Sequence, residues 1–350
     1  MKNKLFSKKL LDWYHQNKRD LPFRHTNDPY KIWLSEIILQ QTRVVQGLLY
    51  YERFVEKFPK VEDLALATEQ TVLNEWQGLG YYSRARNLHY TANFVMNHYN
   101  GQFPSSYEEL IKLKGIGDYT ASAISSFSSK EVRPVLDGNV YRFISRLYGI
   151  ETPINTPKSI KEFKIVLNEL IDDENPDLFN QAIIEYGALF CVPKSPKCQE
   201  CAFQDSCYAF STQRVDQFPV KLKKKKSQER FLNFLAICNK DGYYLVKREG
   251  NAIWKNLYEF PNIESKSFFE EERGEELTEL NVTIEKVGKS MKHILSHQNI
   301  HAKLFVCVPN ANFSDQNSWN WVSKDDFKNY PIHRLMEKMI EAELSEKLSF

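Results

Sequence analysis

Residues 113–121 read Leu-Lys-Gly-Ile-Gly-Asp-Tyr-Thr-Ala and join two segments with the apolar spacing of helices, 107–113 and 118–127. Glycine adopts positive φ angles at little steric cost, so Gly115 and Gly117 allow a tight turn between the two helices. The N–H groups at the start of the second helix have no intrahelical partner and would suit a phosphate group. The tripeptide Gly115-Ile116-Gly117 by itself is compatible with an ordinary glycine-capped helical hairpin or with a hairpin that binds phosphate.

The helical pattern extends on both sides of this hairpin, through residues 1–215. Apolar side chains recur every three or four residues in several segments, such as 30–39, 61–67, 85–98 and 160–170. Turns rich in Pro, Gly and Asn separate these segments. We therefore expect a mostly helical N-terminal part, built as an orthogonal bundle of short helices.

The pattern changes after Phe218-Pro219. Residues 231–238 and 243–246 have the composition of strands and flank Lys240-Asp241-Gly242, which predicts a β-hairpin. Further expected elements are a strand at 302–308, a terminal helix at 331–344, and a loop or exposed helix at the acidic residues 270–276. The C-terminal part is therefore expected to be an α+β domain.

The composition is that of an ordinary globular protein, with 42% hydrophobic and 26% charged residues among 350. Disordered, collagen-like and disulfide-rich miniprotein classes are excluded. Lys and Arg number 47 against 45 Asp and Glu, so the net charge of +2 gives no argument for nucleic-acid binding. No apolar run approaches the ~18 residues of a membrane helix and no secretory leader is visible, so we expect a cytoplasmic, nucleoid-associated monomer without membrane contacts.

Four of the six cysteines lie within 17 residues, in the pattern Cys-x6-Cys-x2-Cys-x5-Cys. In a cytosolic chain, thiols so close are more typical of a metal site than of disulfides. Zinc ribbons usually have two Cys-x2-Cys pairs and this chain has one, which favours an iron–sulfur cluster and leaves zinc as the alternative. The four candidate ligands are Cys191, Cys198, Cys201 and Cys207. Cys238 and Cys307 stand in apolar runs and are expected to be buried small side chains.

The hairpin, the downstream Leu136-Asp137-Gly138-Asn139 and the cysteine spacing together resemble the helix-hairpin-helix DNA glycosylase superfamily. Five short motifs resemble one branch, the MutY-type adenine DNA glycosylases. They are Leu21–Arg24, Asp28–Tyr30, Trp33–Glu36, Leu39–Thr42 and Gln77–Ala85. The resemblance extends over nearly the whole chain, and it implies a [4Fe-4S] cluster and double-stranded DNA as the partner. Three residues depart from the pattern of the family: Asp118 beside the hairpin, Asn256 in place of the usual Gly, and Tyr258 in place of a second Trp.

The same resemblance implies a division into domains. We expect a six-helix-type subdomain with the hairpin at 26–135, a helical iron–sulfur subdomain at 1–25 and 136–215, a linker at 216–229, and a Nudix-like 8-oxoguanine recognition domain at 230–350. The sequence of a Nudix box is missing, so nucleotide hydrolysis is not expected.

Hydrolysis of the N-glycosidic bond of adenine needs an acid to protonate the base and a carboxylate to stabilise the oxocarbenium-like sugar. The resemblance places Glu36 and Asp137 in these roles. Glu36 lies among apolar residues, which can keep a carboxyl protonated near neutral pH by desolvation. Asp137 would stay ionised, with or without a covalent intermediate. Without the resemblance, Glu36 would be interpreted as an exposed helical glutamate and Asp137 as a helix cap.

One position separates the branches of the superfamily. Lyase-active relatives carry a lysine nucleophile at the second residue after Gly-x-Gly, where this chain has Tyr119. A phenol cannot form a Schiff base, so the resemblance implies a monofunctional glycosylase. Tyr119 and Asn139 are expected to position water, the sugar or Asp137, and Arg24 is expected to lie beside the extruded adenine. Structural hydrogen bonding is the alternative for each.

The remaining residues implied by the resemblance would contact DNA. Gln41 and Tyr81 are expected to fill the gap that the extruded adenine leaves, and the amides of Gly115 and Gly117 to hold phosphates. For Tyr81 the alternative is core packing.

The C-terminal motif His293–His297 resembles the 8-oxoguanine recognition loop of the family. Its candidate contacts are Leu295, Ser296 and His297; a metal site that includes His301 is the alternative. The predicted function is excision of adenine opposite 8-oxoguanine or guanine. The rival hypotheses are a lyase-active glycosylase for oxidised pyrimidines and a non-catalytic iron–sulfur protein that binds DNA or senses redox state.

Overall fold

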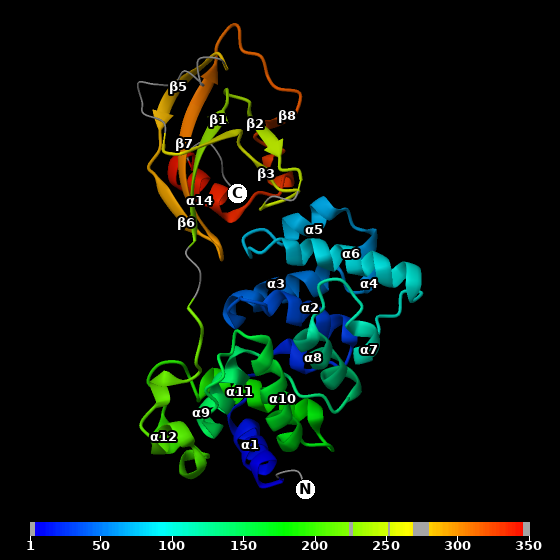
Figure 1. Cartoon of the computed structure of the whole chain (residues 1–350). Helices are drawn as coiled ribbons and strands as arrows, with labels where there is room; N and C mark the ends of the chain where they lie inside the picture. Colours follow the sequence, from blue (N-terminus) through cyan, green and yellow to red (C-terminus); the bar gives the residue numbers. More distant parts are fainter. Residues whose placement is uncertain (1–3, 224–226, 251–252, 269–279, 346–350) are drawn as a thin grey trace. The chain divides into compact units, whose positions relative to one another are not determined.

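The computed structural model describes residues 4–223, 227–250, 253–268 and 280–345 (Figure 1). The chain forms two compact units. The first comprises Met1–Leu66 with Tyr90–Lys223, and the second Ala67–His89 with Lys224–Phe350. No helix in the described segments is long and apolar enough to cross a membrane.

Helices build the first unit and the Ala67–His89 segment of the second, as the apolar spacing predicts. The segments expected at 30–39, 61–67, 85–98 and 160–170 all form helices, which confirms the fold class of this part. The helices of the N-terminal part are α1 Lys4–Asn17, α2 Pro29–Leu39, α3 Val44–Lys57, α4 Val61–Leu66, α5 Glu69–Glu75, α6 Ser83–His98, α7 Tyr107–Leu110, α8 Asp118–Ser129, α9 Gly138–Tyr148, α10 Pro157–Leu170, α11 Pro176–Leu189 and α12 Tyr208–Ser211, with single 3-10 turns at Pro22–Arg24, Cys198–Glu200, Gln204–Ser206 and Val215–Gln217.

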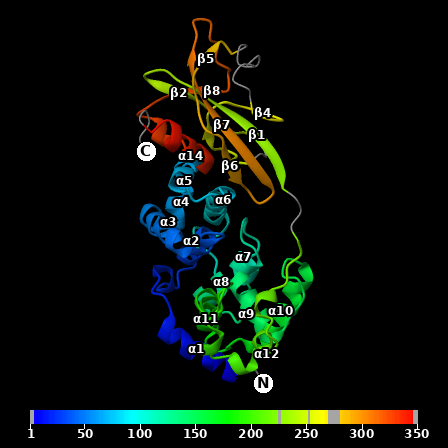
Figure 2. The ribbon, with the colours of Figure 1, turned by 90° about the vertical axis from the view of Figure 1, so that its left-hand side faces the viewer.

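Helices α1 and α9 both pack on α11 (Figure 2). Aromatic side chains form the centre of the core that these helices share. Phe6 packs on Phe203 with ring centroids 4.8 Å apart, and Phe143 on Tyr186 at 4.7 Å. Burial of each such ring contributes roughly 1.5–3 kcal/mol, so this cluster holds the three helices firmly together. The first turn of α9, which carries Asp137 and Asn139, is thereby fixed in place.

The glycine hairpin lies between α7 and α8, where Leu113 and Ile116 anchor it in the core at 3% and 5% exposure. Gly115 has φ +82°, as expected for the tight turn. The same expectation is wrong for Gly117, which has an extended backbone (φ −95°, ψ 178°) because it is the N-cap of α8. A Cβ built on Gly117 would meet nothing within 4 Å, so its backbone is openly accessible.

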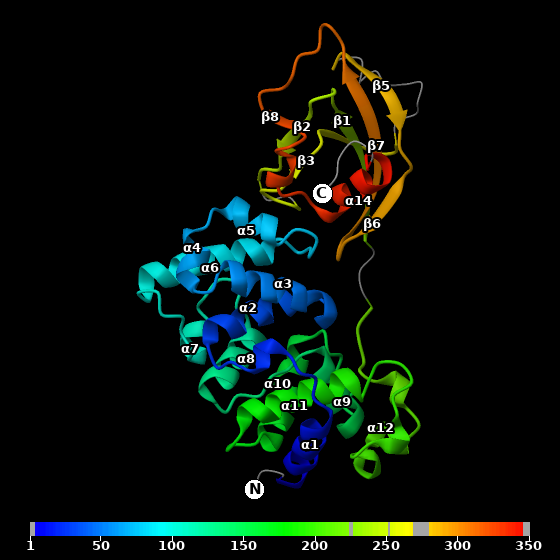
Figure 3. The same cartoon turned by 180° about the vertical axis from the view of Figure 1, so that it is seen from behind.

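In the described residues, two sheets and helix α14 form the C-terminal part of the second unit (Figure 3). In the described residues one sheet has the order β4-β1-β7-β5 with β6 also paired to β7, and the other has the order β3-β2-β8. The elements are β1 Gln228–Ile237, β2 Gly242–Lys247, β3 Tyr258–Glu259, β4 Asn262–Ser265, β5 Val282–Val287, β6 Met291–Ile294, β7 Gln298–Pro309, β8 Trp319–Ser323, a 3-10 turn Phe327–Asn329 and α14 Arg334–Glu343. The expected strand at 302–308 and the terminal helix are confirmed.

The predicted hairpin of β1 and β2 is correct only at its turn. Asn239 N donates to Gly242 O over 3.2 Å and Cys238 pairs with Tyr243, but the two strands then enter different sheets. β1 pairs in parallel with β7 over ten residues, from Gln228 to Ile237. This long buried pairing leaves β2 to pair with β3 and β8 instead.

Cys238 and Cys307 are 4% and 0% exposed, which confirms that they are buried small side chains. The predicted linker begins with ordered contacts inside the first unit, where Ile154 N donates to Val220 O over 2.9 Å. Residues 224–226 of that linker and the acidic residues 270–276 lie outside the described residues.

Candidate active site

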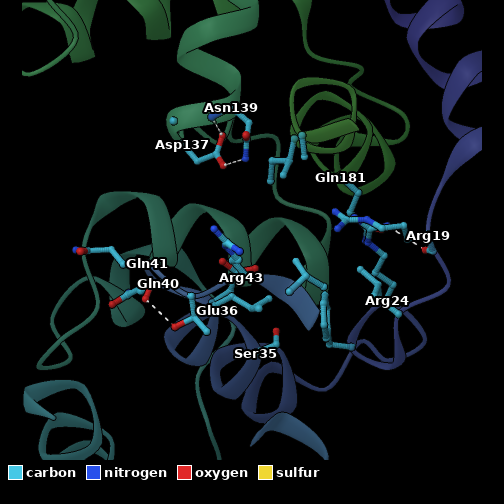
Figure 4. A pocket seen from close by; sticks show the side chains of 18 of the residues that line it. Arg19, Arg24, Ser35, Glu36, Gln40, Gln41, Arg43, Asp137, Asn139 and Gln181 are labelled. Carbon is cyan, nitrogen blue, oxygen red and sulfur yellow. Dashed lines mark hydrogen bonds between the residues drawn. The ribbon is translucent and has the colours of Figure 1, made fainter. Parts of the chain in front are cut away.

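Glu36, Tyr119, Asp137 and Asn139 line the same cavity, whose volume is about 710 Å³ (Figure 4). They come from three helices that are far apart in the sequence: α2, α8 and the start of α9. The close view shows Glu36 and Asp137 on different elements that face this space. The two carboxyl groups predicted from sequence are therefore brought together.

Asp137 is the N-cap of α9, as the structural alternative predicts, and its side chain also lines the cavity. Its Oδ1 accepts hydrogen bonds from Asn139 N (2.9 Å) and Val140 N (2.8 Å), and its Oδ2 accepts one from Asn139 Nδ2 (2.7 Å). Burial raises the pKa of Asp137, while the three N–H donors act in the opposite direction because they stabilise the carboxylate. The carboxylate is thus held in one orientation at the positive end of a helix.

Glu36 has apolar neighbours on both sides along α2, as the sequence predicts. Trp33, Leu34, Ile37 and Ile38 are 4% exposed or less. Burial raises the pKa of Glu36 to about 7, although a hydrogen bond with Tyr119 opposes this shift. A carboxyl with this pKa can carry a proton at neutral pH and release it there.

Arg24 lines the same cavity and is held by Glu185 of α11, a residue that the sequence analysis missed. Glu185 Oε2 accepts from Arg24 Nη2 (2.8 Å) and from Arg19 Nη2 (2.6 Å), and its side chain is fully buried. Burial acts to raise the pKa of Glu185, but the hydrogen bonds from both arginines outweigh it and lower the pKa to about 2. The signal in the sequence was an acidic residue within the apolar segment 182–190.

Gln41 also lines the cavity, and its side chain is exposed. Its φ angle is +56°, in the left-handed region that residues other than glycine rarely adopt. Such strained residues cluster at functional sites. In the second unit Tyr81 has φ +48° and is 48% exposed, so the core-packing alternative for Tyr81 is wrong.

The four clustered cysteines line one small cavity beside α9. Burial raises the pKa values of the Cys191, Cys198 and Cys207 thiols, and the neighbouring cysteines add to this effect. No group of three or more His, Cys, Asp or Glu side chains converges as on a single metal ion within the described residues. Donors do approach the sulfurs: Arg146 Nη1 lies 3.4 Å from Cys191 Sγ.

A chain of hydrogen bonds connects the cysteine loop to the Asp137 carboxylate. Arg142 donates from Nε to Cys191 O over 2.7 Å and from Nη2 to Asn139 Oδ1 over 3.1 Å. Asn139 in turn donates to Asp137. The orientation of Asn139 is therefore set from both ends.

Leu295, Ser296 and His297 form the turn between β6 and β7, which closes through Leu295 N donating to Gln298 O over 2.8 Å. Ser296 and His297 are exposed. We call β6, this turn and the first residues of β7 the recognition hairpin (residues 291–301). His301 and His293 lie on opposite faces of this hairpin. The His301 Nε2 atom forms a hydrogen bond with Glu229 Oε2 over 2.5 Å.

Two domain families match the chain. Residues 34–167 match the HhH-GPD superfamily of base excision DNA repair proteins, and residues 233–342 match the NUDIX domain. The adenine DNA glycosylase of Buchnera aphidicola (from Schizaphis graminum) is 37% identical over 302 residues, which cover 85% of this chain and 86% of that protein. The chain belongs to the adenine DNA glycosylase family. It is thus a DNA glycosylase of base excision repair, a hydrolase of N-glycosyl bonds.

Other relatives agree with this membership. Human adenine DNA glycosylase is 38% identical over 221 residues, covering 61% of this chain and 40% of that protein. Among solved structures, a thermostable thymine-DNA glycosylase is 27% identical and superimposes with a TM-score of 0.56, over 60% of this chain and 96% of that chain. An endonuclease III–DNA complex, 20% identical with a TM-score of 0.53, covers 60% of this chain and 95% of that chain and shows the same helical fold.

Two departures from the family pattern have structural explanations in this glycosylase. Asn256 has φ +64°, a conformation in which asparagine is the best tolerated substitute for glycine. Asp118 accepts hydrogen bonds from Lys164 Nζ (2.6 Å) and Tyr107 Oη (2.9 Å), so its charge beside the hairpin is balanced.

Proposed function

We propose that this adenine DNA glycosylase excises adenine paired with 8-oxoguanine or guanine, with Glu36 as the general acid and Asp137 as the stabilising carboxylate. The observation that carries the proposal is the shared cavity of these two residues, in which the pKa of Glu36 is raised to about 7. A protonated Glu36 donates its proton to the adenine leaving group. Asp137, oriented by three N–H donors, then stabilises the positive charge that develops on the sugar.

Tyr119 and Asn139 position these two carboxyl groups. The Tyr119 hydroxyl bonds Glu36, and the burial that excludes water raises the pKa of Tyr119 well above its ordinary value. Tyr119 therefore stays a neutral donor near neutral pH. Because a phenol forms no Schiff base, the reaction ends with base release, as in a monofunctional enzyme.

The extruded adenine enters the cavity beside Arg24. The ion pair with Glu185 neutralises Arg24 and fixes its guanidinium group, which leaves a defined set of donors for the base. Gln41 stands at the same cavity and is exposed to the duplex, where its amide bonds the base that has lost its partner. Tyr81 intercalates in the stack.

The glycine hairpin holds the DNA backbone. The N–H groups of Gly115 and Gly117 donate to phosphates, and the open space around Gly117 lets a phosphate approach the start of α8. Such contacts fix the register of the protein on the duplex without selecting a sequence.

Leu295, Ser296 and His297 select the base opposite adenine. Their exposure on a tight turn leaves hydrogen-bonding groups of Ser296 and His297 available for the edge of an oxidised purine. Adenine itself is a normal base, so a contact with its partner is what restricts excision to mispairs.

Cys191, Cys198, Cys201 and Cys207 fit a [4Fe-4S] cluster, because four thiols surround one space and N–H donors approach the sulfurs of Cys191 and Cys201. The cluster, when bound, would order the loop 191–207. In addition to Cys191 Sγ, Arg146 donates to Val192 O and Pro193 O, so it fastens this loop to α9.

The deciding experiment incubates the purified protein with a duplex that contains a single adenine opposite 8-oxoguanine and measures free adenine. Release of adenine, without strand cleavage until alkali is added, is expected. The same duplex with thymine opposite adenine is the control and should be inert. Strand cleavage without alkali would favour the lyase, and tight binding without release would favour the non-catalytic DNA-binding protein.

A further inference from the structure

The turn that carries Tyr81 is bonded to the backbone of the C-terminal part, within the same compact unit. The Tyr82 hydroxyl donates to Ile332 O over 3.2 Å, and Ile332 N donates to Gln77 Oε1 over 3.3 Å. Residue Ile332 thus holds the chain on both sides of Tyr81. Tyr82 is 4% exposed, so its hydrogen bond is shielded from water.

The turn itself is folded tightly enough to transmit this constraint to Tyr81. Gly78, Gly80 and Tyr81 have positive φ angles of 86°, 74° and 48°. Gly80 O accepts from Trp76 Nε1 (3.0 Å) and from Arg84 Nη2 (3.2 Å), which closes the turn from both sides. The guanidinium of Arg84 also lies 5.6 Å from the Tyr81 ring centroid. Tyr81 therefore projects in a direction that its neighbours determine.

From Ile332 a series of ring contacts leads to the recognition hairpin. The imidazole of His333 stacks on the indole of Trp254 with centroids 3.7 Å apart and planes at 12°. Trp254 also contacts His293 of β6, with centroids 5.9 Å apart. His293 stands three residues before Ser296, on the strand that leads into the turn.

His333 is a fixed point in this series. It is fully buried, its Nδ1 accepts from Met336 N (3.1 Å) as the cap of α14, and its Nε2 donates to Glu259 Oε2 (3.0 Å). Glu259 is itself paired with Arg248 over 2.5 Å. Because both ring nitrogens are used, His333 cannot rotate without breaking buried hydrogen bonds.

Additional bonds hold α5 to the segment before α14. Gln70 Nε2 and Asn74 Nδ2 both donate to Asn329 O, at 2.7 and 3.0 Å. These two bonds lie at the exposed edge of the contact and involve neither Ile332 nor His333.

We propose that Tyr82 is a positioning residue for mispair recognition: it holds the Tyr81 turn and the recognition hairpin at a fixed separation, so that both meet the same duplex together. The inference rests on the proposed roles of Tyr81, Ser296 and His297. Its consequence is energetic coupling: insertion of Tyr81 brings Ser296 and His297 onto the oxidised purine, and their contact in turn favours insertion. Loss of the Tyr82 hydroxyl uncouples the two events.

The test is a double-mutant cycle on single-turnover excision. The variants are Tyr82→Phe, Ser296→Ala/His297→Ala and their combination, each measured with adenine opposite 8-oxoguanine and opposite guanine. A buried hydrogen bond contributes about 0.5–1.5 kcal/mol, so Tyr82→Phe should slow excision opposite 8-oxoguanine roughly 2- to 10-fold. Opposite guanine its effect should be under about 2-fold, and in the Ser296→Ala/His297→Ala background the loss should disappear.

Tyr243→Phe is the matched control. It removes the same atom from a buried tyrosine of the same unit, but its hydroxyl has no hydrogen-bond partner in the described part of the chain. Excision by this variant should not change on either duplex. Gln77→Leu removes the second bond to Ile332 and should reproduce the selective loss seen with Tyr82→Phe.

Two outcomes would overturn this inference and leave the proposed function standing. One is an equal fold-loss of excision by Tyr82→Phe on both duplexes, which indicates that the hydroxyl is merely structural. The other is a combined variant whose fold-loss of excision is the product of the fold-losses of its two parents, which indicates that they act independently. If Ser296→Ala/His297→Ala leaves the preference for 8-oxoguanine unchanged, the proposed recognition role fails, and the inference fails with it. The two failures are therefore distinguishable in one set of measurements.

Discussion

Asn139 Nδ2 donates to Asp137 Oδ2 over 2.7 Å, and the same side chain accepts from Arg142 Nη2 over 3.1 Å. The amide is thus clamped between a cation and the carboxylate that faces the cavity. Together with the backbone N–H of Val140, Asn139 therefore orients the Asp137 carboxyl and favours its ionised form.

The variant Asn139→Ala should lower single-turnover excision about 10- to 100-fold, because hydrogen bonds to charged groups contribute roughly 1.5–3 kcal/mol. In the proposed mechanism Asp137 acts as the ionised form, so activity should fall as pH drops through its pKa. Loss of a donor raises that pKa further, and the acidic limb of the pH profile should move to higher pH. Tyr148→Phe, at the far end of α9, is the control. An unshifted acidic limb would contradict the role of Asn139.

Glu36 sets the basic limb of the same profile. In the proposed mechanism the proton donor is protonated Glu36. Excision should therefore be constant between the acidic limb and about pH 7, and fall tenfold per pH unit above it, as the pKa of about 7 requires. Glu36→Gln should bind the mispaired duplex with unchanged affinity and release no adenine. Rates measured from pH 5 to pH 9 would contradict the assignment if they show no basic limb.

The buried Glu36 carboxyl should also lower the free energy of unfolding at alkaline pH. Burial raises the pKa of Glu36 from 4.5 to about 7, so the folded state binds this proton more tightly than the unfolded state. Protonation of Glu36 makes its full contribution to the free energy of unfolding below about pH 4.5. This contribution is lost as pH rises to about 7, by up to about 3 kcal/mol. Urea unfolding should therefore find Glu36→Gln more stable than the parent at pH 8 and equal to it near pH 4. Equal stability at both pH values would exclude a buried, protonated Glu36.

Local patterns predicted the elements of this fold well, because helical spacing and strand composition are properties of short segments. The helices around Glu36 and the strand at 302–308 are examples. The pairing of β1 was not predictable in this way. The Lys240-Asp241-Gly242 turn favours a hairpin, but β1 pairs along its length with β7, whose residues lie 70 positions further along the chain.

The grouping of candidate residues around a common cavity was predictable where residue type and family resemblance coincide, as at Glu36, Asp137 and the four cysteines. Residues whose expected role is to position other residues were not predictable from the sequence. Glu185 is a single glutamate in an apolar helix, and only the folded chain shows that two arginines reach it. Tyr82 and Ile332 are ordinary apolar positions in the sequence, and their contact spans 250 residues.

The cysteine cavity predicts the metal content of the purified protein. A [4Fe-4S] cluster requires about four iron and four sulfide per chain. Cys198→Ser should reduce both and lower the thermal stability, since the loop 191–207 loses its tether. Stoichiometric zinc instead of iron would show that the alternative interpretation of the cysteine spacing is correct. Cys238→Ser, in the C-terminal part, is the control and should leave the iron content unchanged.

Glu185 should be among the most costly polar residues to replace. Its side chain is fully buried, and removal of its charge leaves Arg24, which is 13% exposed, and the partly buried Arg19 without a counter-ion. Breaking a buried pair in this way costs about 3–5 kcal/mol. Glu151→Gln is the matched control, because Glu151 pairs with Arg214 at the surface over 2.7 Å, where an ion pair contributes at most about 1 kcal/mol. Urea unfolding of Glu185→Gln and Glu151→Gln at pH 7 compares the two. A similar small loss in both variants would mean that water reaches the arginines and that Glu185 does not fix Arg24 in the cavity.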